Sequence, residues 1–589
     1  MTKPGIAFGD YISTEKIRKR SWHYDYREKS PRNIFMLFLS TSLFFILFAR
    51  LFFVQIINGA YYKYLSDNNR IKKVVVHAPR GIIFDRNRVP LTFNLPGYRE
   101  LVNGKTILIS QDQALNMIAN GAKDLEVDSL REYPYKDAFA HVLGYIGQIS
   151  PEELKMPDYI GYKPGDLVGK MGLEQYYEQL LKGIDGDQLY EVDATGQLVR
   201  KLGQDDPSPG QNITTTLDEK LQVAVYDAMK NVKRGAVIVS NPTGGILAIV
   251  SKPSFDPNLF TMGTDYQNSS ASSYTNVDQI VADSRNQPFL NRAISGVYPP
   301  GSTFKLIVAA AGLSDKIIDE NWTVEDTGVL QVGSFSFSNW YYTGYGGKDG
   351  QVNVVKGIKR SNDIFFYKLA EKVGVDKVSE MAKKFGLDKK LGIDLQGEEA
   401  GTVPTPEWKL KTIGEQWYLG DTYHYGIGQG FLLTTPLQVN EWTQGIANGG
   451  KLYKPHLLKN SATQVIASNL LDPKSTDLIR EGMIEACDPG GVAWPLFDFK
   501  VNNTKLKIDN KNITEAASSS ANMRHVVIAC KTGTAEVGGA TTLPHAWITL
   551  FAPAYNPQIV VTVLVENAGE GSNVAGPIAK QILDEWFSR

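Results

Sequence analysis

HAWITLFAPAYNPQIVVTVLVEN, residues 545–567, contains two runs rich in β-branched and aromatic residues, with a Pro/Asn turn between them. This pattern predicts two neighbouring strands, over 545–552 and 558–567. A third run, HVVIACKTG, covers 525–533, and far upstream GAVIVS and ILAIVS flank Asn241-Pro-Thr-Gly-Gly, a pattern typical of a hairpin. Strands from both ends of this region therefore enclose a mainly helical middle. We expect an α+β fold in which a central antiparallel sheet is packed between helices.

Length and composition indicate a folded chain with several domains. The 589 residues are too many for one hydrophobic core, and 42% hydrophobic with 21% charged residues excludes a mostly disordered or fibrous protein. The 62 Lys and Arg nearly balance the 63 Asp and Glu, so binding to nucleic acid is not expected. Two cysteines, Cys487 and Cys530, are too few for a disulfide framework or a multi-cysteine zinc site, and the sequence leaves open whether they pair.

The most hydrophobic stretch, IFMLFLSTSLFFILFARLFFVQII, covers residues 34–57. As a helix it would reach about 36 Å, which is enough to cross a hydrocarbon core of about 30 Å. A buried core helix is the alternative. Residues 16–33 hold seven Lys and Arg against four in residues 58–75, which predicts a cytoplasmic tail and an external remainder. We interpret 34–57 as an uncleaved signal anchor.

Four regions follow from these patterns: a cytoplasmic tail over 1–33, a transmembrane anchor over 34–57, and two external domains over 58–215 and 216–589. The first external domain mixes short strand-like runs with turns, and Pro207-Ser-Pro-Gly-Gln211 is typical of a boundary. The second should begin with a helix over 217–232 and end with an amphipathic helix at about 575–588. A Gly/Tyr/Ser-rich stretch at 332–350 is expected to be a turn-rich insert.

The first candidate for chemistry is Ser302-Thr-Phe-Lys305, which follows a Pro/Gly break and precedes an apolar run. The break should start a helix at about Ser302, with Lys305 one turn along on the same face. A helix N-terminus favours a developing alkoxide, and a desolvated lysine can remove a hydroxyl proton. The alternative is an ordinary helix cap, because the same Ser-x-x-Lys pattern occurs at Ser13 to Lys16 in the predicted tail.

Two further motifs are individually weak. Ser361-Asn-Asp363 precedes an expected helix, so Ser361 could simply be its N-cap. Lys531-Thr-Gly533-Thr534 ends a predicted strand, where a lysine and a threonine hydroxyl could hold a carboxylate and a glycine could admit a ligand. The alternative is a plain strand end.

Taken together, the three motifs resemble those of the penicillin-binding transpeptidases. The resemblance runs from the anchor to the last helix. Within the family, the chain is most similar to the class B, elongation-type group known as penicillin-binding protein 2. It rests on these segments: Arg80-Gly-Ile-Ile-Phe-Asp85-Arg-Asn87, His141-Val-Leu-Gly-Tyr-Ile-Gly147, Gly169-Lys-Met-Gly-Leu-Glu174, Glu191-Val-Asp-Ala-Thr-Gly196, Gly426-Ile-Gly-Gln-Gly430 and Thr435-Pro-Leu-Gln438. Two departures stand out: the segment between Asn87 and Tyr133 is short, and Asp363 stands where many relatives have Asn.

This resemblance implies an elongated pedestal over 58–215, a transpeptidase domain over 216–589, and D,D-transpeptidation of peptidoglycan stem peptides during cell-wall elongation. It implies these roles: Ser302 as nucleophile, Lys305 as proton acceptor, Ser361 as proton relay, an oxyanion hole from the backbone N–H groups of Ser302 and Thr534, and carboxylate binding by Lys531 and Thr532 beside Gly533. The role of Asp363 stays open, because an ionised Asp cannot donate a hydrogen bond.

The resemblance also implies inhibition by β-lactams, a SEDS-family membrane glycosyltransferase and the elongation machinery as partners, the bacterial cytoplasmic membrane as location, and no cofactor or metal. A D,D-carboxypeptidase, a division-type enzyme, a serine β-lactamase and a membrane sensor without turnover are the alternatives. A bifunctional polymerase is disfavoured, because about 155 residues between anchor and transpeptidase leave little room for a second enzyme.

Overall fold

The computed structural model describes residues 31–103, 105–120, 122, 125–193, 198–263, 265–269, 274–502, 523–539 and 542–589. Apart from its last three residues, the tail expected over 1–33 lies outside this part. The chain divides into two compact units. One holds residues up to Val74 together with Gln188–Gln204, and the other holds Val75–Asp187 and Asp205–Arg589.

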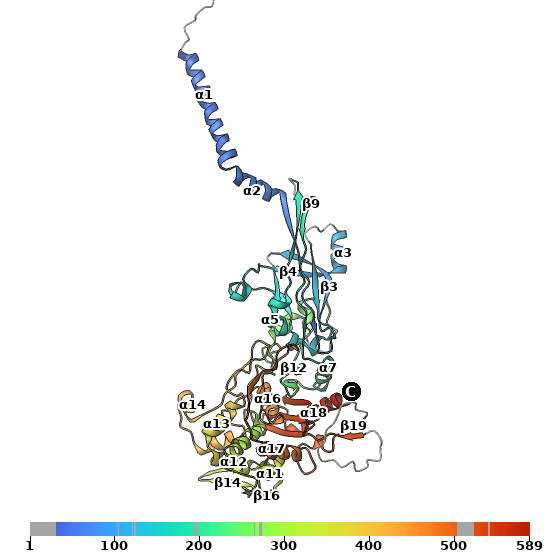
Figure 1. The fold of residues 1–589 in the computed structure, drawn as a ribbon, viewed down its shortest axis with the longest axis vertical. Coiled ribbons are helices and arrows are strands. Elements are labelled where there is room, and N and C mark those ends of the chain that lie inside the picture. Colours follow the sequence, from blue (N-terminus) through green and yellow to red (C-terminus); the bar gives the residue numbers. More distant parts are fainter. Residues whose placement is uncertain are drawn as a thin grey trace, which may run out of the picture. The chain divides into compact units, whose positions relative to one another are not determined.

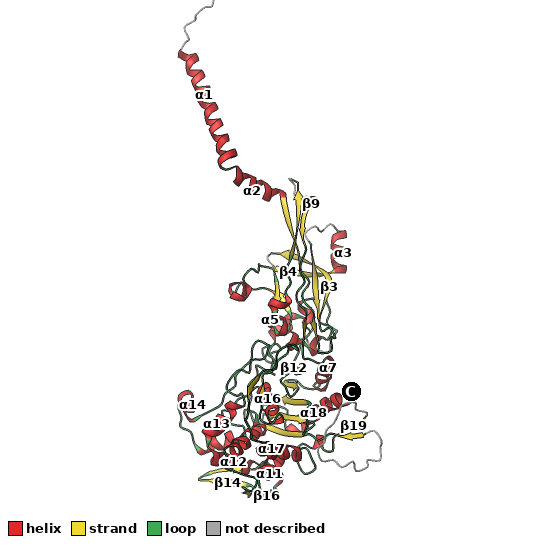
Figure 2. Ribbon diagram, viewed as in Figure 1, coloured by secondary structure: helices red, strands yellow, loops and turns green. Residues whose placement is uncertain are grey.

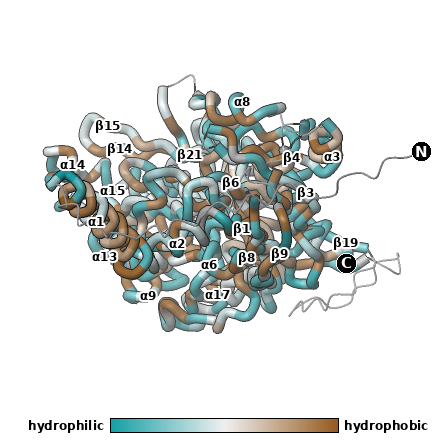
Figure 3. The backbone as a smooth tube through the Cα atoms, turned by 90° about the horizontal axis from the view of Figure 1, so that it is seen from above, coloured by the Kyte–Doolittle hydropathy of each residue, from teal (hydrophilic) through white to brown (hydrophobic). Residues whose placement is uncertain are grey.

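The first unit begins with a long apolar helix. α1 (Pro31–Phe52) continues into a π-helical turn, η2 (Phe53–Ile57), and α2 (Gly59–Arg70) follows. Pro31–Ile57 is long and apolar enough to cross a membrane, and none of its most apolar window is buried. Figure 3 shows hydrophobic colours along α1. Most of a three-stranded sheet, in the order β1 (Ile71–Val76), β8 (Gly186–Val192), β9 (Leu198–Asp205), also belongs to this unit.

The second unit opens with small sheets and short helices. β3 (Phe93–Val102) is the centre of an antiparallel sheet with β4 (Lys105–Ser110) and β5 (Glu126–Glu132). The other elements of residues 75–214 are β2 (Ile83–Phe84), α3 (Gln111–Ala119), η3 (Lys136–Ala138), α4 (Ala140–Leu143), β6 (Ile146–Gln148), η4 (Glu153–Lys155), η5 (Pro157–Tyr159), β7 (Leu167–Gly169), α5 (Gly172–Tyr176), α6 (Glu178–Leu181) and β10 (Ile213–Thr214).

A five-stranded antiparallel sheet forms the centre of the remaining part, as expected. Its order is β12 (Ile246–Lys252), β11 (Gly235–Ser240), β23 (Ile559–Val565), β22 (His545–Ala552), β21 (Ala529–Ala535). The strand expected over 525–533 is divided into β20 (Met523–His525), which pairs with β19 (Lys500–Asn502), and β21. β21 is therefore an edge strand of the central sheet.

Both faces of the central sheet are buried. In β23, Val560 and Leu564 join one core while Val561 and Val563 join the other, because alternate residues of a strand face opposite sides. Strands buried on both faces read as continuous apolar runs, which is why the sequence pattern identified them. Helices α7 (Glu219–Ala228) and α18 (Gly571–Phe587) contribute side chains to the second core, and α16 (Pro436–Ala447) contributes to the first. Figures 1 and 2 show α16 and α18 lying against the strands.

The helical middle supplies the rest of the first core. Its elements are η6 (Pro257–Phe260), α8 (Val277–Ala282), η7 (Gly301–Phe304), α9 (Lys305–Ser314), α11 (Val354–Arg360), α12 (Asp363–Val373), α13 (Val375–Lys384), α14 (Pro406–Thr412), α15 (Leu419–Gly426), α17 (Pro473–Ala486) and η8 (Trp494–Leu496), with a short pair β17 (Leu452–Tyr453) and β18 (Val465–Ala467). The insert contains β13 (Val324–Asp326), β14 (Val329–Val332), β15 (Phe335–Ser338), α10 (Trp340–Tyr345) and β16 (Gly350–Val352).

Candidate active site

Ser302 lies in a tight turn that leads into a buried helix. The residues Gly301–Phe304 form the 3-10 turn η7, and the regular helix α9 begins only at Lys305, three residues later than the sequence predicted. Ser302 is partly exposed, whereas Thr303, Phe304 and Lys305 are buried. Among the described residues, the Ser302 hydroxyl makes no hydrogen bond. It is therefore available to an incoming group.

The Gly426–Gly430 segment fixes the turn that carries Ser302. The Gly301 N–H donates to the Gly428 carbonyl oxygen at 2.9 Å. Both glycines have positive φ, and a Cβ on Gly428 would lie 2.1 Å from the Gly301 carbonyl oxygen. Only glycine fits this close approach. The sequence resemblance included this segment but gave no reason for it, and its packing against Gly301 supplies one.

Ser361 lies between two helices in a strained conformation. It is the C-cap of α11, with φ 51° and ψ 38° in the left-handed region, which costs a non-glycine residue about 1–3 kcal/mol. The alternative that Ser361 is an N-cap is wrong. Asn362 takes that place, because its side chain accepts the Phe365 N–H at the start of α12. A fixed, strained serine is typical of a functional site.

The Lys531–Thr534 segment lies in the edge strand β21. Lys531 and Thr532 are buried, whereas Thr534 is exposed. A Cβ on Gly533 would lie 3.0 Å from the Pro300 carbonyl oxygen, and a Cβ on Gly301 would lie 3.0 Å from the Thr534 carbonyl oxygen. The third motif therefore packs directly against the turn that carries Ser302. Gly533 permits this approach of protein to protein, besides any approach by a ligand.

Two lysines converge on the Ser361 hydroxyl. Lys531 Nζ donates to Ser361 Oγ at 2.8 Å, and Lys305 Nζ donates to the same oxygen at 3.3 Å. Lys305 Nζ also donates to the Ser361 carbonyl oxygen at 2.7 Å and to Asp363 Oδ1 at 2.6 Å. The structure thus brings the side chains of four expected residues into one hydrogen-bonded group: Lys305, Ser361, Asp363 and Lys531. Ser302 joins them through its turn and not through a hydrogen bond of its hydroxyl.

Burial and mutual repulsion set the charges of this group. Both lysine side chains are fully buried. Burial lowers the pKa of Lys305, and the Asp363 carboxylate opposes this effect. Burial and then the nearby Lys305 ammonium lower the pKa of Lys531 well below its usual value. An amine that is easily neutralised next to a hydroxyl can accept or pass on a proton, which is acid–base chemistry suited to acyl transfer.

A disulfide lies next to this group. Cys487, the C-cap of α17, pairs with Cys530 of β21, with their Cα atoms 6.0 Å apart. Cys530 directly precedes Lys531, so the bond attaches the edge strand to α17. The sequence left this pairing open, and no local pattern could have predicted it.

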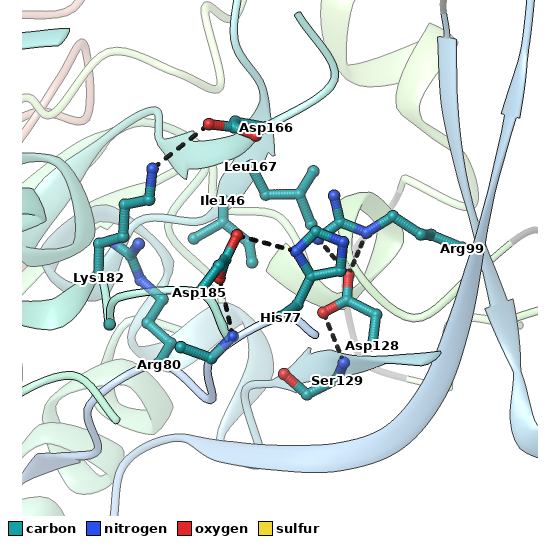
Figure 4. A pocket seen from close by; sticks show the side chains of 12 residues that line it. His77, Arg80, Arg99, Asp128, Ser129, Ile146, Asp166, Leu167, Lys182 and Asp185 are labelled. Atoms are coloured by element: carbon teal, nitrogen blue, oxygen red, sulfur yellow. Dashed lines mark hydrogen bonds and ion pairs between the residues drawn. The ribbon is translucent and has the colours of Figure 1, made fainter. Parts of the chain in front are cut away.

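A small polar cavity lies apart from this group, among the small sheets of residues 75–187 (Figure 4). It holds about 60 Å³, room for only a few water molecules. His77 bonds to Asp185 at 3.0 Å and Arg99 pairs with Asp128 at 2.7 Å, as Figure 4 shows. With its charges paired and so little space, this cavity is not a candidate for catalysis.

The chain matches two protein families over adjoining regions. Residues 234–584 match the penicillin-binding protein transpeptidase domain, and residues 113–215 match the penicillin-binding protein dimerisation domain. The chain is 33% identical to the peptidoglycan D,D-transpeptidase MrdA of Acinetobacter baumannii over 607 aligned positions, covering 92% of this chain and 85% of the relative.

Solved structures give the same result. Pseudomonas aeruginosa PBP2 in complex with WCK 5153 aligns with a TM-score of 0.66 and 34% identity, covering 87% of this chain and 96% of that one. Helicobacter pylori PBP2 from its complex with MreC aligns with a TM-score of 0.70 and 29% identity, covering 88% and 98%. The resemblance seen in the sequence motifs is confirmed: this chain is a member of the penicillin-binding protein transpeptidase family, in the same group as the MrdA and PBP2 proteins.

Proposed function

We propose that this chain is a peptidoglycan D,D-transpeptidase that cross-links stem peptides during cell-wall elongation through an acyl-enzyme on Ser302. The observation that carries the proposal is the convergence of Lys305 and Lys531 on the Ser361 hydroxyl, beside the turn that presents Ser302. The MrdA relative is itself a peptidoglycan D,D-transpeptidase, which supports the same reaction here.

Acylation begins with a neutral Lys305. The Ser302 oxygen attacks the carbonyl carbon of the penultimate D-alanine, and the Ser302 proton moves to the Lys305 amine. The Lys305 pKa, lowered by burial, favours the neutral form that this step needs. Catalytic hydrogen bonds often tighten only when substrate is bound, which agrees with the free hydroxyl of Ser302. The Ser302 and Thr534 backbone N–H groups form the oxyanion hole.

The tetrahedral intermediate then collapses. The C–N bond to the terminal D-alanine breaks, and the departing amine takes a proton through Ser361, which contacts both lysines. Lys531 and Thr532 bind the substrate's terminal carboxylate. An amine of a second stem peptide attacks the ester carbonyl, the new amide forms, and Ser302 regains its proton.

Membrane location and partners belong to the same proposal. The apolar helix Pro31–Ile57 anchors the chain once in the bacterial cytoplasmic membrane, with 1–33 as a cytoplasmic tail and the domains 58–215 and 216–589 outside. A SEDS-family glycosyltransferase polymerises the glycan that this enzyme cross-links. The Helicobacter pylori PBP2 structure is a complex with MreC, which supports a protein partner for this chain as well.

The test is covalent labelling by penicillin. Its ring carbonyl can acylate a serine, and its carboxylate resembles the terminal carboxylate of the stem peptide that donates the acyl group. The full chain in detergent should gain the mass of one whole penicillin, with the adduct on the peptide that contains Ser302. Ser302→Ala should remain unlabelled, whereas Ser13→Ala, which removes the other Ser-x-x-Lys serine, should label normally. Labelling of Ser302→Ala contradicts the nucleophile assignment. With a stem-peptide donor, an amide product distinguishes transpeptidation from the hydrolysis that a carboxypeptidase would perform.

A further inference from the structure

Asp363 is held by a second set of groups besides Lys305, one on its carboxylate and one on its backbone. The Trp340 backbone N–H donates to Asp363 Oδ2 at 2.9 Å, and the Asp363 N–H donates to Asn339 Oδ1 at 3.2 Å. Asn339 and Trp340 come from the Gly/Tyr/Ser-rich insert, at the start of α10. Nothing in the sequence motifs pointed to either residue.

Asn339 is itself fixed in a buried polar network. Its side chain is fully buried, and its Nδ2 donates to Asp326 Oδ2 at 2.8 Å. The same oxygen accepts from Asn362 Nδ2 at 2.8 Å and from the Asp349 N–H at 3.0 Å. Both ends of the Asn339 amide are therefore used, one on Asp326 and the other on the Asp363 backbone. Buried networks in which every member is bonded are rigid.

We propose that Asn339 and the Trp340 N–H are positioning groups for the transpeptidase reaction: Asn339 holds the Asp363 backbone and the Trp340 N–H holds its carboxylate, so that Oδ1 meets Lys305. This inference rests on the proposed function of Ser302 and Lys305. A carboxylate offers two equivalent oxygens and turns easily about its last bond. The hydrogen bond from the Trp340 N–H to Oδ2 fixes the rotation of the carboxylate, and in that orientation Oδ1 accepts from Lys305 Nζ at 2.6 Å. The insert thus acts on the proton acceptor through Asp363, without touching the substrate.

Because of the position of Trp340 in its helix, the contact with Asp363 can be tested by removing the Trp340 N–H alone. Trp340 is the first residue of α10, so its N–H has no partner within the helix. Proline is well tolerated at this position. Asn339 has φ −79° and ψ 138°, the region that a residue before proline prefers. Trp340→Pro should therefore keep the backbone while removing the N–H.

Trp340→Ala is the matched control. Both variants lose the indole, and with it the hydrogen bond from Trp340 Nε1 to the Arg360 carbonyl oxygen. The two differ in the N–H that bonds to Asp363. Penicillin acylation of the full chain would be resolved into the dissociation constant of the non-covalent complex and the first-order acylation rate constant. Thermal unfolding and the final labelled fraction would report how much protein is folded.

We expect the acylation rate constant of Trp340→Pro to be at least about tenfold below that of Trp340→Ala, the size expected for a lost hydrogen bond to a charged group. The dissociation constant should be equal in the two, because Lys531 and Thr532 are untouched. On an Asp363→Ala background the ratio should return to about one, since the acceptor of the N–H is gone. If Trp340→Pro folds poorly, the acylation rate constants of Asn339→Ala and Ser336→Ala are compared instead, since Ser336 is an exposed residue of the same insert. The rate constant of Asn339→Ala should be the lower of the two.

Equal acylation rate constants for Trp340→Pro and Trp340→Ala, with normal labelling of the unmodified chain, would overturn the inference and leave the proposed function intact. A ratio that persists on the Asp363→Ala background would also overturn it, because the effect would then be general to the fold. An unmodified chain that is never acylated on Ser302 would overturn the proposed function itself, and this inference with it.

Discussion

Replacing Asp363 by Asn keeps the shape of the side chain and removes the negative charge that faces Lys305. In the structure, Asp363 Oδ1 accepts from Lys305 Nζ at 2.6 Å and Oδ2 accepts from the Trp340 N–H at 2.9 Å. An amide has only one acceptor oxygen, so one of the two donors must lose its partner. The variant therefore tests both the charge and the hydrogen bonds of Asp363.

The distance sets the size of the effect. Two unit charges 2.6 Å apart attract each other by about 6 kcal/mol at an effective dielectric constant of about 20. Removing one partner of a buried pair usually costs about 3–5 kcal/mol. We expect Asp363→Asn to lower the free energy of unfolding by about 3 kcal/mol at pH 7. We also expect the Lys305 pKa to fall further, because the carboxylate that opposes the effect of burial is removed.

The sign of the pH dependence follows from linkage. The Lys305 pKa in the folded chain is already below its usual value, because burial outweighs the attraction of Asp363. Between the folded and unfolded pKa values the unfolded chain binds more protons, so stability increases with pH in that window. Asp363→Asn widens the window toward lower pH. Its stability deficit should be fully present below the Lys305 pKa of the folded variant, and should shrink as the pH rises through the Lys305 pKa of the unmodified folded chain.

Denaturant unfolding from pH 6 to 10 measures the stability change, and penicillin acylation over the same range measures the pH–rate profile. If neutral Lys305 is the proton acceptor, the acid limb of that profile should move to lower pH in the variant. Asp315→Asn, which breaks an exposed pair with Lys377, is the control and should change stability by less than about 1 kcal/mol. An acid limb that stays in place or moves to higher pH would refute the assignment of Lys305.

Two further predictions concern the supports of the site. Removing the disulfide by Cys487→Ala with Cys530→Ala should lower the free energy of unfolding by about 4 kcal/mol, because a loop with a 43-residue separation is no longer closed in the unfolded chain. Reductant should lower the thermal midpoint of the unmodified chain but not that of the variant. A variant with the same midpoint as the unmodified chain would contradict this estimate. Gly428→Ala should reduce the acylation rate by about a hundredfold, because its Cβ would displace the Gly301 turn. Gly449→Ala, which also has positive φ but no atom within 4 Å, is the control, and an equal loss in both variants would rule out the steric explanation.

The central sheet could be predicted because its strands are buried on both faces. Runs such as 559–565 are apolar at every position except Thr562, and turn residues separate them clearly. The three motifs of the candidate site could be found because each is short and contiguous. Ser302 and Lys305 are one turn apart, and Lys531 and Thr532 are neighbours in a strand. Local pattern was enough to predict the strands, whereas the roles of these residues followed only from the resemblance of the three motifs taken together.

Contacts between distant segments could not be predicted in this way. The Asn339 side chain accepts the N–H of Asp363, the first residue of α12, although in the sequence this asparagine looks like that of any polar loop. For Ser361 a helix N-cap was the alternative to a role in proton transfer, yet it is a C-cap in the left-handed region, and its hydroxyl contacts two lysines from other elements. In each case the partner lies far away in sequence, and only the folded chain specifies it.

The charge balance of the buried group leads to a last prediction. Lys305 and Lys531 contribute up to two positive charges and Asp363 contributes one negative charge, so the group has an uncompensated positive charge when both amines are protonated. Buried charge without a partner is costly, which agrees with the lowered pKa of Lys531. A bound carboxylate would supply the missing negative charge and raise that pKa. Ligand binding should therefore take up a proton.

Calorimetry with Ser302→Ala, which binds penicillin without acylation, measures this uptake. Titrations in two buffers of different ionisation enthalpy should give proton uptake at pH values between the Lys531 pKa of the free protein and that of the complex, because there Lys531 is neutral before the ligand binds and protonated afterwards. The same titration with the added Lys531→Met change should show an uptake near zero, although binding will be weaker. No uptake at any pH, or proton release, would mean that Lys531 is already charged in the free enzyme. Binding of the donor carboxylate would then be a simple ion pair, with no coupling to the protonation of the site.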